Sequence, residues 1–333
     1  MPPTSGTPLS RRAVLLGACG LAGAAALGAC GSSGSKSTAT GPGDTSQDPT
    51  MSLTPVDGAT LIPIFGADAS YQYVVSGSPQ RLAFGVDGPE GEHLTDVPAS
   101  LSFQLSKDGQ PVGTPTEVLA HSDGVPIAFY PYRTTFASPG TYQVAVTLDG
   151  KEKTASFDVI DPADTKLVPR GGAMVPVATP TVTDAHGVAP ICTQPAGTCP
   201  FHTLTVTEAL ASGKPTALLI ATPKFCQIGV CGPVLDLLVE VGAGFPGVQI
   251  IHAEVYTDAE AIFDSTSATG NGSGTPAAPA DATGQAQLAP VVDAYGLSFE
   301  PALYLANGSG TIVDRLDNVF DRGEIRLGLQ AIA

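Results

Sequence analysis

Residues 216–241, TALLIATPKFCQIGVCGPVLDLLVEV, constrain the fold of this chain most strongly. They open with an apolar run, residues 216–221, whose length and composition are typical of a buried strand. After a short turn come Cys226 and Cys231, with four residues between them, and then an apolar-periodic stretch that indicates a helix. Unpaired backbone N–H groups and the positive end of the dipole lie at a helix N-terminus, and both favour thiolate over thiol. This order of elements therefore predicts a cysteine pair suited to disulfide exchange.

The same stretch resembles the thioredoxin-fold superfamily through its strand, the aromatic residue before Cys226, the second cysteine and the helix that follows. Thioredoxin itself has only two residues between its cysteines. It also has a buried Asp where this chain has Ile220, and a Trp where this chain has Phe225. The resemblance is therefore to the fold family, and it implies a thioredoxin-like α/β domain over residues 191–333.

The elements expected around the cysteine helix agree with this resemblance. The pattern predicts a second strand over 248–255, a terminal hairpin turning at Asn307-Gly308, and an amphipathic helix over 322–332. Further expected segments are a helix over 205–212, a polar insertion over 264–283, a helix over 286–295, and hairpin strands over 301–306 and 310–316. Strand–helix–strand–helix–strand–strand–helix is the thioredoxin order.

The resemblance also implies roles for three residues. Cys226 would attack a substrate disulfide as a thiolate, Cys231 would resolve the mixed disulfide, and Pro301 would position the substrate peptide. Thioredoxin folds carry a cis-proline before the third strand, so the resemblance implies a cis bond between Glu300 and Pro301, although trans is the default for most X–Pro bonds. The expected partner is a protein thiol or disulfide.

A second pair, Cys192 and Cys199, lies upstream with six residues between the two cysteines. In an exported chain such a loop is most simply closed by a structural disulfide. Two alternatives stay open. Cys192, Cys199 and His202 would bind a metal ion with an unknown fourth ligand, although the spacing fits no common zinc pattern. Otherwise the pair would pass electrons to the downstream cysteines.

Two alternative functions follow from the same residues. Envelope copper chaperones of the Sco type also combine a thioredoxin fold with two cysteines and a distant histidine, which here implies Cys226, Cys231 and His252. Soft thiolates suit cuprous ion, but Sco-type proteins space their cysteines by three residues. No other cofactor is expected. The second alternative is a non-enzymatic envelope binding or scaffold protein whose disulfides are structural.

The start of the chain, residues 1–30, reads as a targeting segment outside the fold. Residues 10–12, SRR, resemble a twin-arginine export motif, and residues 27–30, LGAC, resemble a bacterial lipobox in which Cys30 receives lipid. Residues 31–54 contain almost nothing apolar and predict a flexible tether. We therefore expect a lipoprotein held at the extracytoplasmic face of the cell membrane.

Residues 55–160 predict an all-β domain. Residues 142–148 alternate apolar and polar side chains, Asp149-Gly150 is a strong hairpin signal, and the next segment alternates again. About seven short strands at this spacing, with a corner at residues 139–142, are similar to an immunoglobulin-like β-sandwich. The segment contains no cysteine, so the sandwich would lack the inter-sheet disulfide.

Composition limits the remaining possibilities. The chain has 15 Lys and Arg against 31 Asp and Glu, a net charge of −16, which repels phosphate polymers and argues against nucleic-acid binding. Its 39 Gly and 30 Pro favour strands, turns and linkers, and residues 161–190 predict the linker between the two domains. The sequence thus predicts a membrane-anchored, two-domain thiol–disulfide oxidoreductase.

Overall fold

The structure, a computed structural model, describes residues 58–65, 73–226, 229–260 and 287–333. The expected signal segment with Cys30, the tether over 31–54 and the insertion over 264–283 lie outside the described residues. Within those residues, no helix has the length and apolar character needed to cross a membrane.

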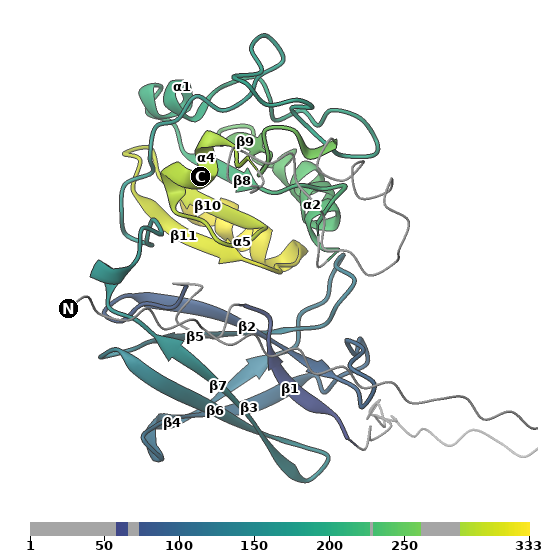
Figure 1. The fold of residues 1–333 in the computed structure, drawn as a ribbon, viewed down its shortest axis with the longest axis vertical. Coiled ribbons are helices and arrows are strands. Elements are labelled where there is room, and N and C mark those ends of the chain that lie inside the picture. The colour runs from purple at the N-terminus through teal and green to yellow at the C-terminus, as the bar shows by residue number, and fades with distance from the viewer. Residues whose placement is uncertain (1–57, 66–72, 227–228, 261–286) are drawn as a thin grey trace, which may run out of the picture. The chain divides into compact units, whose positions relative to one another are not determined.

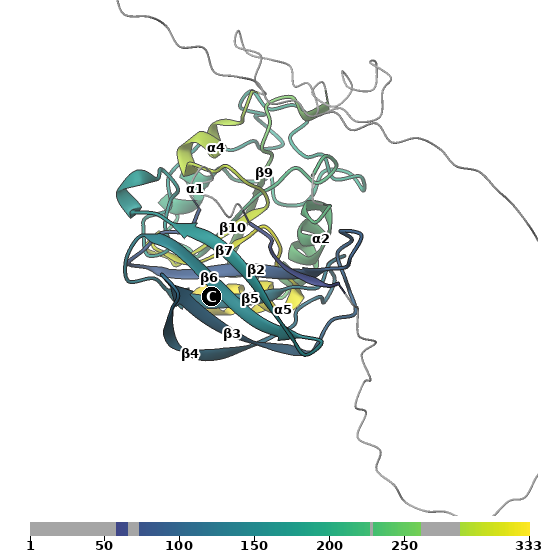
Figure 2. The ribbon, with the colours of Figure 1, turned by 60° about the horizontal axis from the view of Figure 1, so that its bottom comes forward.

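The N-terminal part of the described chain is a sandwich of two antiparallel sheets (Figure 1). Its strands are β1 (Thr60–Pro63), β2 (Pro79–Asp87), β3 (Ser100–Lys107), β4 (Gln110–Leu119), β5 (Tyr130–Thr135), β6 (Gly140–Leu148) and β7 (Lys151–Val159). One sheet has the order β1-β2-β5, and the other has the order β4-β3-β6-β7. Figure 2 shows the four-stranded sheet from its broad side. This distribution of the strands between two sheets is that of an immunoglobulin-like sandwich. The predicted immunoglobulin-like sandwich is therefore confirmed.

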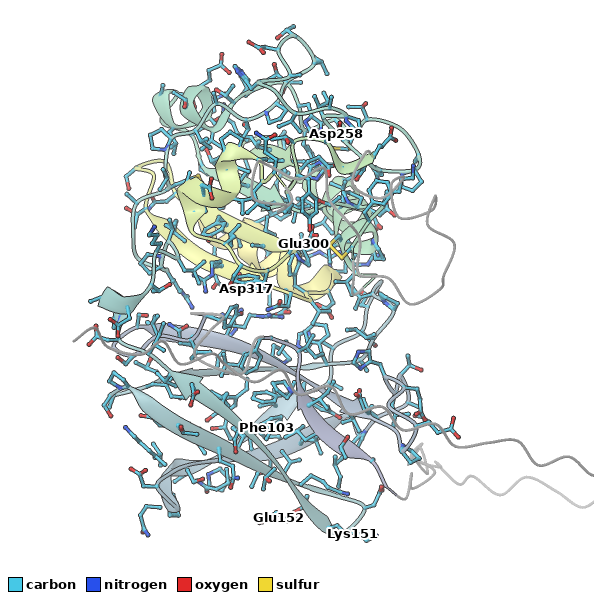
Figure 3. The ribbon with its side chains drawn as sticks, viewed as in Figure 1. Phe103, Lys151, Glu152, Asp258, Glu300 and Asp317 are labelled. Carbon is cyan, nitrogen blue, oxygen red and sulfur yellow. A yellow bond between two sulfur atoms is a disulfide. The ribbon has the colours of Figure 1, made fainter. Side chains whose placement is uncertain are left out.

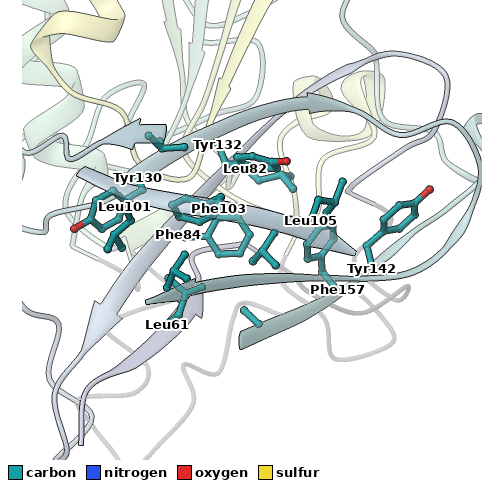
Figure 4. Packing of buried hydrophobic residues seen from close by; sticks show 14 of the residues in the cluster. Leu61, Leu82, Phe84, Leu101, Phe103, Leu105, Tyr130, Tyr132, Tyr142 and Phe157 are labelled. Atoms are coloured by element: carbon teal, nitrogen blue, oxygen red, sulfur yellow. The ribbon is translucent and has the colours of Figure 1, made fainter. Parts of the chain in front are cut away.

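Alternation of side chains builds the core of the sandwich. On β6 the residues Tyr142, Val144, Val146 and Leu148 are all buried, as their spacing predicts. Aromatic rings fill the space between the sheets (Figure 4). The rings of Phe84 and Phe103 lie 5.5 Å apart, a distance typical of favourable aromatic pairs.

One tight turn and one corner help to set the register of the second sheet. Asp149 and Gly150 both have positive φ, the conformation of a type I′ hairpin turn between β6 and β7. At the expected corner, the Tyr142 hydroxyl donates to the Ser138 carbonyl at 2.9 Å. The corner of immunoglobulin-like domains uses the same kind of bond to fix the start of a late strand.

The C-terminal part is a mixed α/β region around a four-stranded sheet of order β11-β10-β8-β9 (Figure 1). Its elements are α1 (Val206–Ala211), β8 (Thr216–Ile220), α2 (Cys231–Gly242), β9 (Gln249–Ala253), α4 (Pro290–Tyr295), β10 (Ala302–Ala306), β11 (Ile312–Asp317) and α5 (Arg322–Ile332). Strands β8 and β9 are parallel, and β10 pairs antiparallel with both β8 and β11. The predicted order of elements is therefore present.

Strand β8 is apolar after its first residue, Thr216, because helices cover both faces of the sheet. Ala217 and Leu219 belong to the apolar cluster that contains α2 and α5. Leu218 and Ile220 belong to the cluster that contains α1 and α4. All of these side chains are fully buried, which explains a continuous apolar run in place of alternation.

The predicted linker, residues 161–190, packs against the α/β region. After a short 3₁₀ turn, η2 (Pro162–Asp164), the chain contributes Leu167, Met174 and Val188 to the core of that region. The Val168 and Met174 amides also donate to backbone carbonyls of the α/β region. The sequence did not predict that this segment contributes to the core, because its apolar residues are isolated among Pro, Thr and Gly and show neither helical nor strand periodicity.

A buried ion pair joins the sandwich to the α/β region. The Arg81 guanidinium on β2 binds the Glu324 carboxylate on α5 and donates to the carbonyls of Asp317 and Val319. The Tyr73 hydroxyl donates to Asp317 at 2.9 Å. Because a buried charge needs a partner, these contacts tie the two regions together.

Candidate functional site

The first cysteine site lies where β8 passes into α2. Cys226 follows the turn after the strand, and Cys231 is the first residue of the helix. The two residues form a disulfide, with their Cα atoms 5.7 Å apart. The Cys231 amide, one of the unpaired N–H groups at the helix start, donates to the Cys226 sulfur at 3.3 Å. The local sequence therefore places the Cys226 sulfur at the positive end of a helix.

The two sulfurs differ in accessibility. Cys226 is half-buried, whereas Cys231 is completely buried beneath the turn. The exposed Lys224 contacts the ring of Phe225 and pairs with Glu260 at 3.5 Å. An incoming thiolate would therefore reach the Cys226 sulfur, and Cys231 is the protected partner.

Glu300 adds a carboxyl group that sequence reasoning did not single out. Its Oε2 lies 3.7 Å from the Cys231 sulfur and accepts the Thr222 amide at 2.5 Å. Burial raises the pKa of Glu300 to about 7, although the hydrogen bond from Thr222 opposes the shift. Figure 3 shows Glu300 beside the yellow disulfide bond. A proton acceptor close to neutral pH thus faces the buried sulfur.

The bond between Glu300 and Pro301 is cis. The cis geometry expected from the resemblance is therefore confirmed. Pro301 directly precedes β10 and follows the carboxyl group that contacts Cys231. The sequence feature that could have identified Glu300 is its position directly before this proline.

A second cysteine site is built on the loop before α1. Cys192 and Cys199 are both buried and are free thiols. The expected disulfide between them is therefore not formed in this structure, where the loop turns both sulfurs toward histidine side chains. The ligand atoms of Cys192, Cys199, His202 and His252 all lie within 4.8 Å of one another. A hydrogen bond from the Cys199 thiol is the largest cause of the lowered pKa of the Cys192 thiol.

The histidine that the copper interpretation needs belongs to this second cluster. The Nδ1 atom of His252 lies 3.6 Å from the Cys199 sulfur, and its Nε2 atom bonds the Ala221 carbonyl at 3.0 Å. Both ring nitrogens are thus engaged away from the first site. Among the described residues, the expected copper set of Cys226, Cys231 and His252 is not brought together as one group.

Thr193 and Glu254 connect the two sites. The Thr193 amide donates to Glu254 at 2.5 Å, and the Thr193 hydroxyl accepts the Lys224 amide at 3.2 Å. Glu254, which directly follows β9, is completely buried. Burial raises its pKa to about 8. The loop of the second site is therefore fixed to the turn that carries Cys226.

Comparisons with known proteins find structural similarity to chains from titin and obscurin-like structures. No protein-family model matches the chain, and no curated protein sequence matches it. A chimeric titin Z1Z2 functionalized with a KLER exogenous peptide from decorin is similar at 17% identity and a TM-score of 0.19, over 31% of this chain and 95% of that chain. A chain of the Titin M10–Obscurin like 1 Ig complex is similar at 19% identity and a TM-score of 0.18, over 32% of this chain and 98% of that chain.

Proposed function

We propose that this protein is an extracytoplasmic thiol–disulfide oxidoreductase that acts through Cys226 and Cys231. The observation that carries the proposal is the disulfide at the start of α2, with an accessible first sulfur and a buried second sulfur next to Glu300. Thiol–disulfide exchange needs an attackable sulfur, a good leaving thiolate and access for a second thiol. The half-buried Cys226 sulfur supports access, and the Cys231 amide that donates to it supports a thiolate at Cys226.

The architecture around the pair supports a thioredoxin-like domain. The central strand β8 pairs parallel with β9 and antiparallel with β10, and helices pack on both faces of the sheet. The cysteine pair follows the central strand, and the cis-proline precedes β10. The wider cysteine spacing places the second cysteine, rather than the first, at the first position of the helix.

The chemistry can be written as a balanced reaction. The Cys226 thiolate attacks a substrate disulfide, which forms a mixed disulfide and releases one substrate thiolate. Cys231 gives its proton to the Glu300 carboxylate and attacks the Cys226 sulfur. This step restores the Cys226–Cys231 disulfide and releases the second substrate thiolate. The substrate gains two electrons and the protein loses two; the reverse sequence oxidises a substrate dithiol.

Glu300 takes the place of the buried acid that this chain lacks at Ile220. A carboxylate with a pKa near 7 is half-deprotonated at neutral pH, so it can both accept and return the proton of Cys231. The proposed location follows from the N-terminal sequence: twin-arginine export, lipid on Cys30 and a tether over 31–54 would hold this site at the outer face of the membrane, where disulfides persist.

The test is a redox titration of the full chain against glutathione and dithiothreitol buffers, read by thiol labelling and peptide mass spectrometry. We expect a reversible couple between about −270 and −120 mV, the range of known exchange proteins. A couple below about −300 mV is typical of structural disulfides and would leave a binding scaffold instead.

Matched variants identify the nucleophile. Cys231→Ser should accumulate a mixed disulfide with a model peptide disulfide, because Cys226 can attack but nothing resolves the product. Cys226→Ser should accumulate none, because Cys231 is buried. Equal trapping by both variants would contradict the assignment of Cys226 as the attacking residue.

A further inference from the structure

The cluster of Cys192, Cys199, His202 and His252 is not used by the proposed exchange reaction. The first three residues come from the loop before α1, and His252 comes from β9. Their exposed fractions are 8%, 5%, 0% and 0%. Four buried side chains of metal-ligating types therefore converge from two separate segments of the chain.

Backbone carbonyls fix which nitrogen of each imidazole carries its proton. His202 directs Nδ1 to the Pro180 carbonyl at 3.3 Å, and His252 directs Nε2 to the Ala221 carbonyl at 3.0 Å. Because a carbonyl can only accept, those nitrogens are the donors. The remaining nitrogens, Nε2 of His202 and Nδ1 of His252, lie 3.3 Å apart, and in two neutral imidazoles each of them offers a lone pair. Two facing lone pairs repel unless a cation lies between them.

The distances are those of a tetrahedral metal site. With Zn–S bonds of about 2.3 Å and Zn–N bonds of about 2.0–2.1 Å, a sulfur and a nitrogen ligand lie about 3.5 Å apart and two nitrogen ligands about 3.3 Å apart. The observed distances are 3.6 Å between the Cys199 sulfur and Nδ1 of His252, and 3.3 Å between the two nitrogens. The carbonyl bonds of both histidines are the outer contacts that orient metal-ligating imidazoles.

We propose that Cys192, Cys199, His202 and His252 bind a zinc ion. Two thiolates and two neutral imidazoles around Zn²⁺ make a group of zero net charge, which a buried site tolerates best. Cuprous ion with the same ligands would leave a buried negative charge. Four protein ligands fill the tetrahedron, so the site is a closed, structural one.

The zinc ion would order the turn that carries Cys226. His252 holds the Ala221 carbonyl at the end of β8, and Thr193, next to Cys192, accepts the Lys224 amide. Both contacts hold residues of the segment that leads from β8 to Cys226. The ion would also keep Cys192 and Cys199 as thiolates, so they would not compete with Cys226 in disulfide exchange.

The first test needs no variant. The full chain is produced in medium with zinc and purified without chelators, and its metal content is measured by mass spectrometry. We expect about one zinc ion per chain, and X-ray absorption at the zinc edge should show two sulfur ligands at about 2.3 Å and two nitrogen ligands at about 2.0–2.1 Å. Absence of bound metal, copper in place of zinc, or a Cys192–Cys199 disulfide in peptide mapping would each overturn the proposal.

Variants then assign the ligands independently of the exchange reaction. His202→Gln and His252→Gln should each lose the zinc, whereas His93→Gln, at an exposed histidine of the sandwich, should keep it. Cys226→Ser/Cys231→Ser should also keep the full zinc content while it loses exchange activity. Zinc loss in this double variant would overturn the assignment of the site, whatever the outcome of the redox titration.

Discussion

The two cysteine pairs of this protein have the same functional groups in different surroundings. Cys226 and Cys231 form a disulfide at the N-terminus of α2, with one sulfur accessible. Cys192 and Cys199 are buried free thiols beside two imidazoles. The first pair meets backbone N–H groups and the second meets nitrogen lone pairs. Under the two proposals, the neighbouring groups decide whether a cysteine pair favours electron exchange or metal binding.

Removal of zinc should have the largest effect on stability. A ligand that binds only the folded state at 1,000 times its dissociation constant stabilises that state by about 4 kcal/mol. We expect chelation to lower the free energy of unfolding of the wild-type protein by about that amount, measured by urea denaturation. The Cys192→Ser/Cys199→Ser variant is the control and should not respond to chelator. If chelation leaves the free energy of unfolding of the wild type unchanged, the proposed difference between a metal-binding pair and a redox pair is contradicted.

The next effect is a pH dependence that arises at Glu300. Its pKa is about 7 in the folded protein and about 4.5 when unfolded, so between these values the folded state holds more protons. Stability must therefore fall as pH rises from about 4.5 to 7, by up to about 3 kcal/mol. In Glu300→Gln the stability should fall less over this pH range, because the glutamine side chain does not ionise.

The measurement for Glu300 is urea denaturation of both proteins at pH 5 and pH 8. Glu254 also has a raised pKa, to which the charge of Glu300 contributes, so the same comparison is repeated in a Glu254→Gln background to isolate Glu300. Equal losses in wild type and Glu300→Gln would mean that Glu300 is solvated. It would then be unsuited to receive the proton of Cys231.

Loss of the Cys226–Cys231 disulfide should have the smallest effect. The bond closes a loop with a sequence separation of 5, and so short a loop restricts the unfolded chain by only about 2 kcal/mol. We expect Cys226→Ser/Cys231→Ser to be destabilised by about this amount in the same denaturation assay. If this variant loses more free energy of unfolding than the wild type loses on zinc removal, a structural role for the Cys226–Cys231 disulfide is favoured.

Local patterns in the sequence predicted most of the elements. The final helix was expected over 322–332, and α5 spans Arg322–Ile332. The hairpin at Asp149-Gly150 joins β6 and β7 as expected, because the turn chemistry is local. Strands β4 and β5 were not individually anticipated. Strand β4 is almost entirely exposed, so it lacks the apolar alternation by which strands are recognised.

The sequence by itself determined the Cys226–Cys231 pair and its helix, because every residue involved lies within one strand–turn–helix unit. Only the tertiary structure decided the chemistry around the other cysteines. His252 is 50 residues from His202 in the chain, and Glu300 is 69 residues from Cys231. No periodicity encodes such distances, since strand pairing and packing across the sheet bring these side chains together. For that reason the fourth ligand of the upstream cluster and the carboxyl group beside Cys231 became visible only in the folded chain.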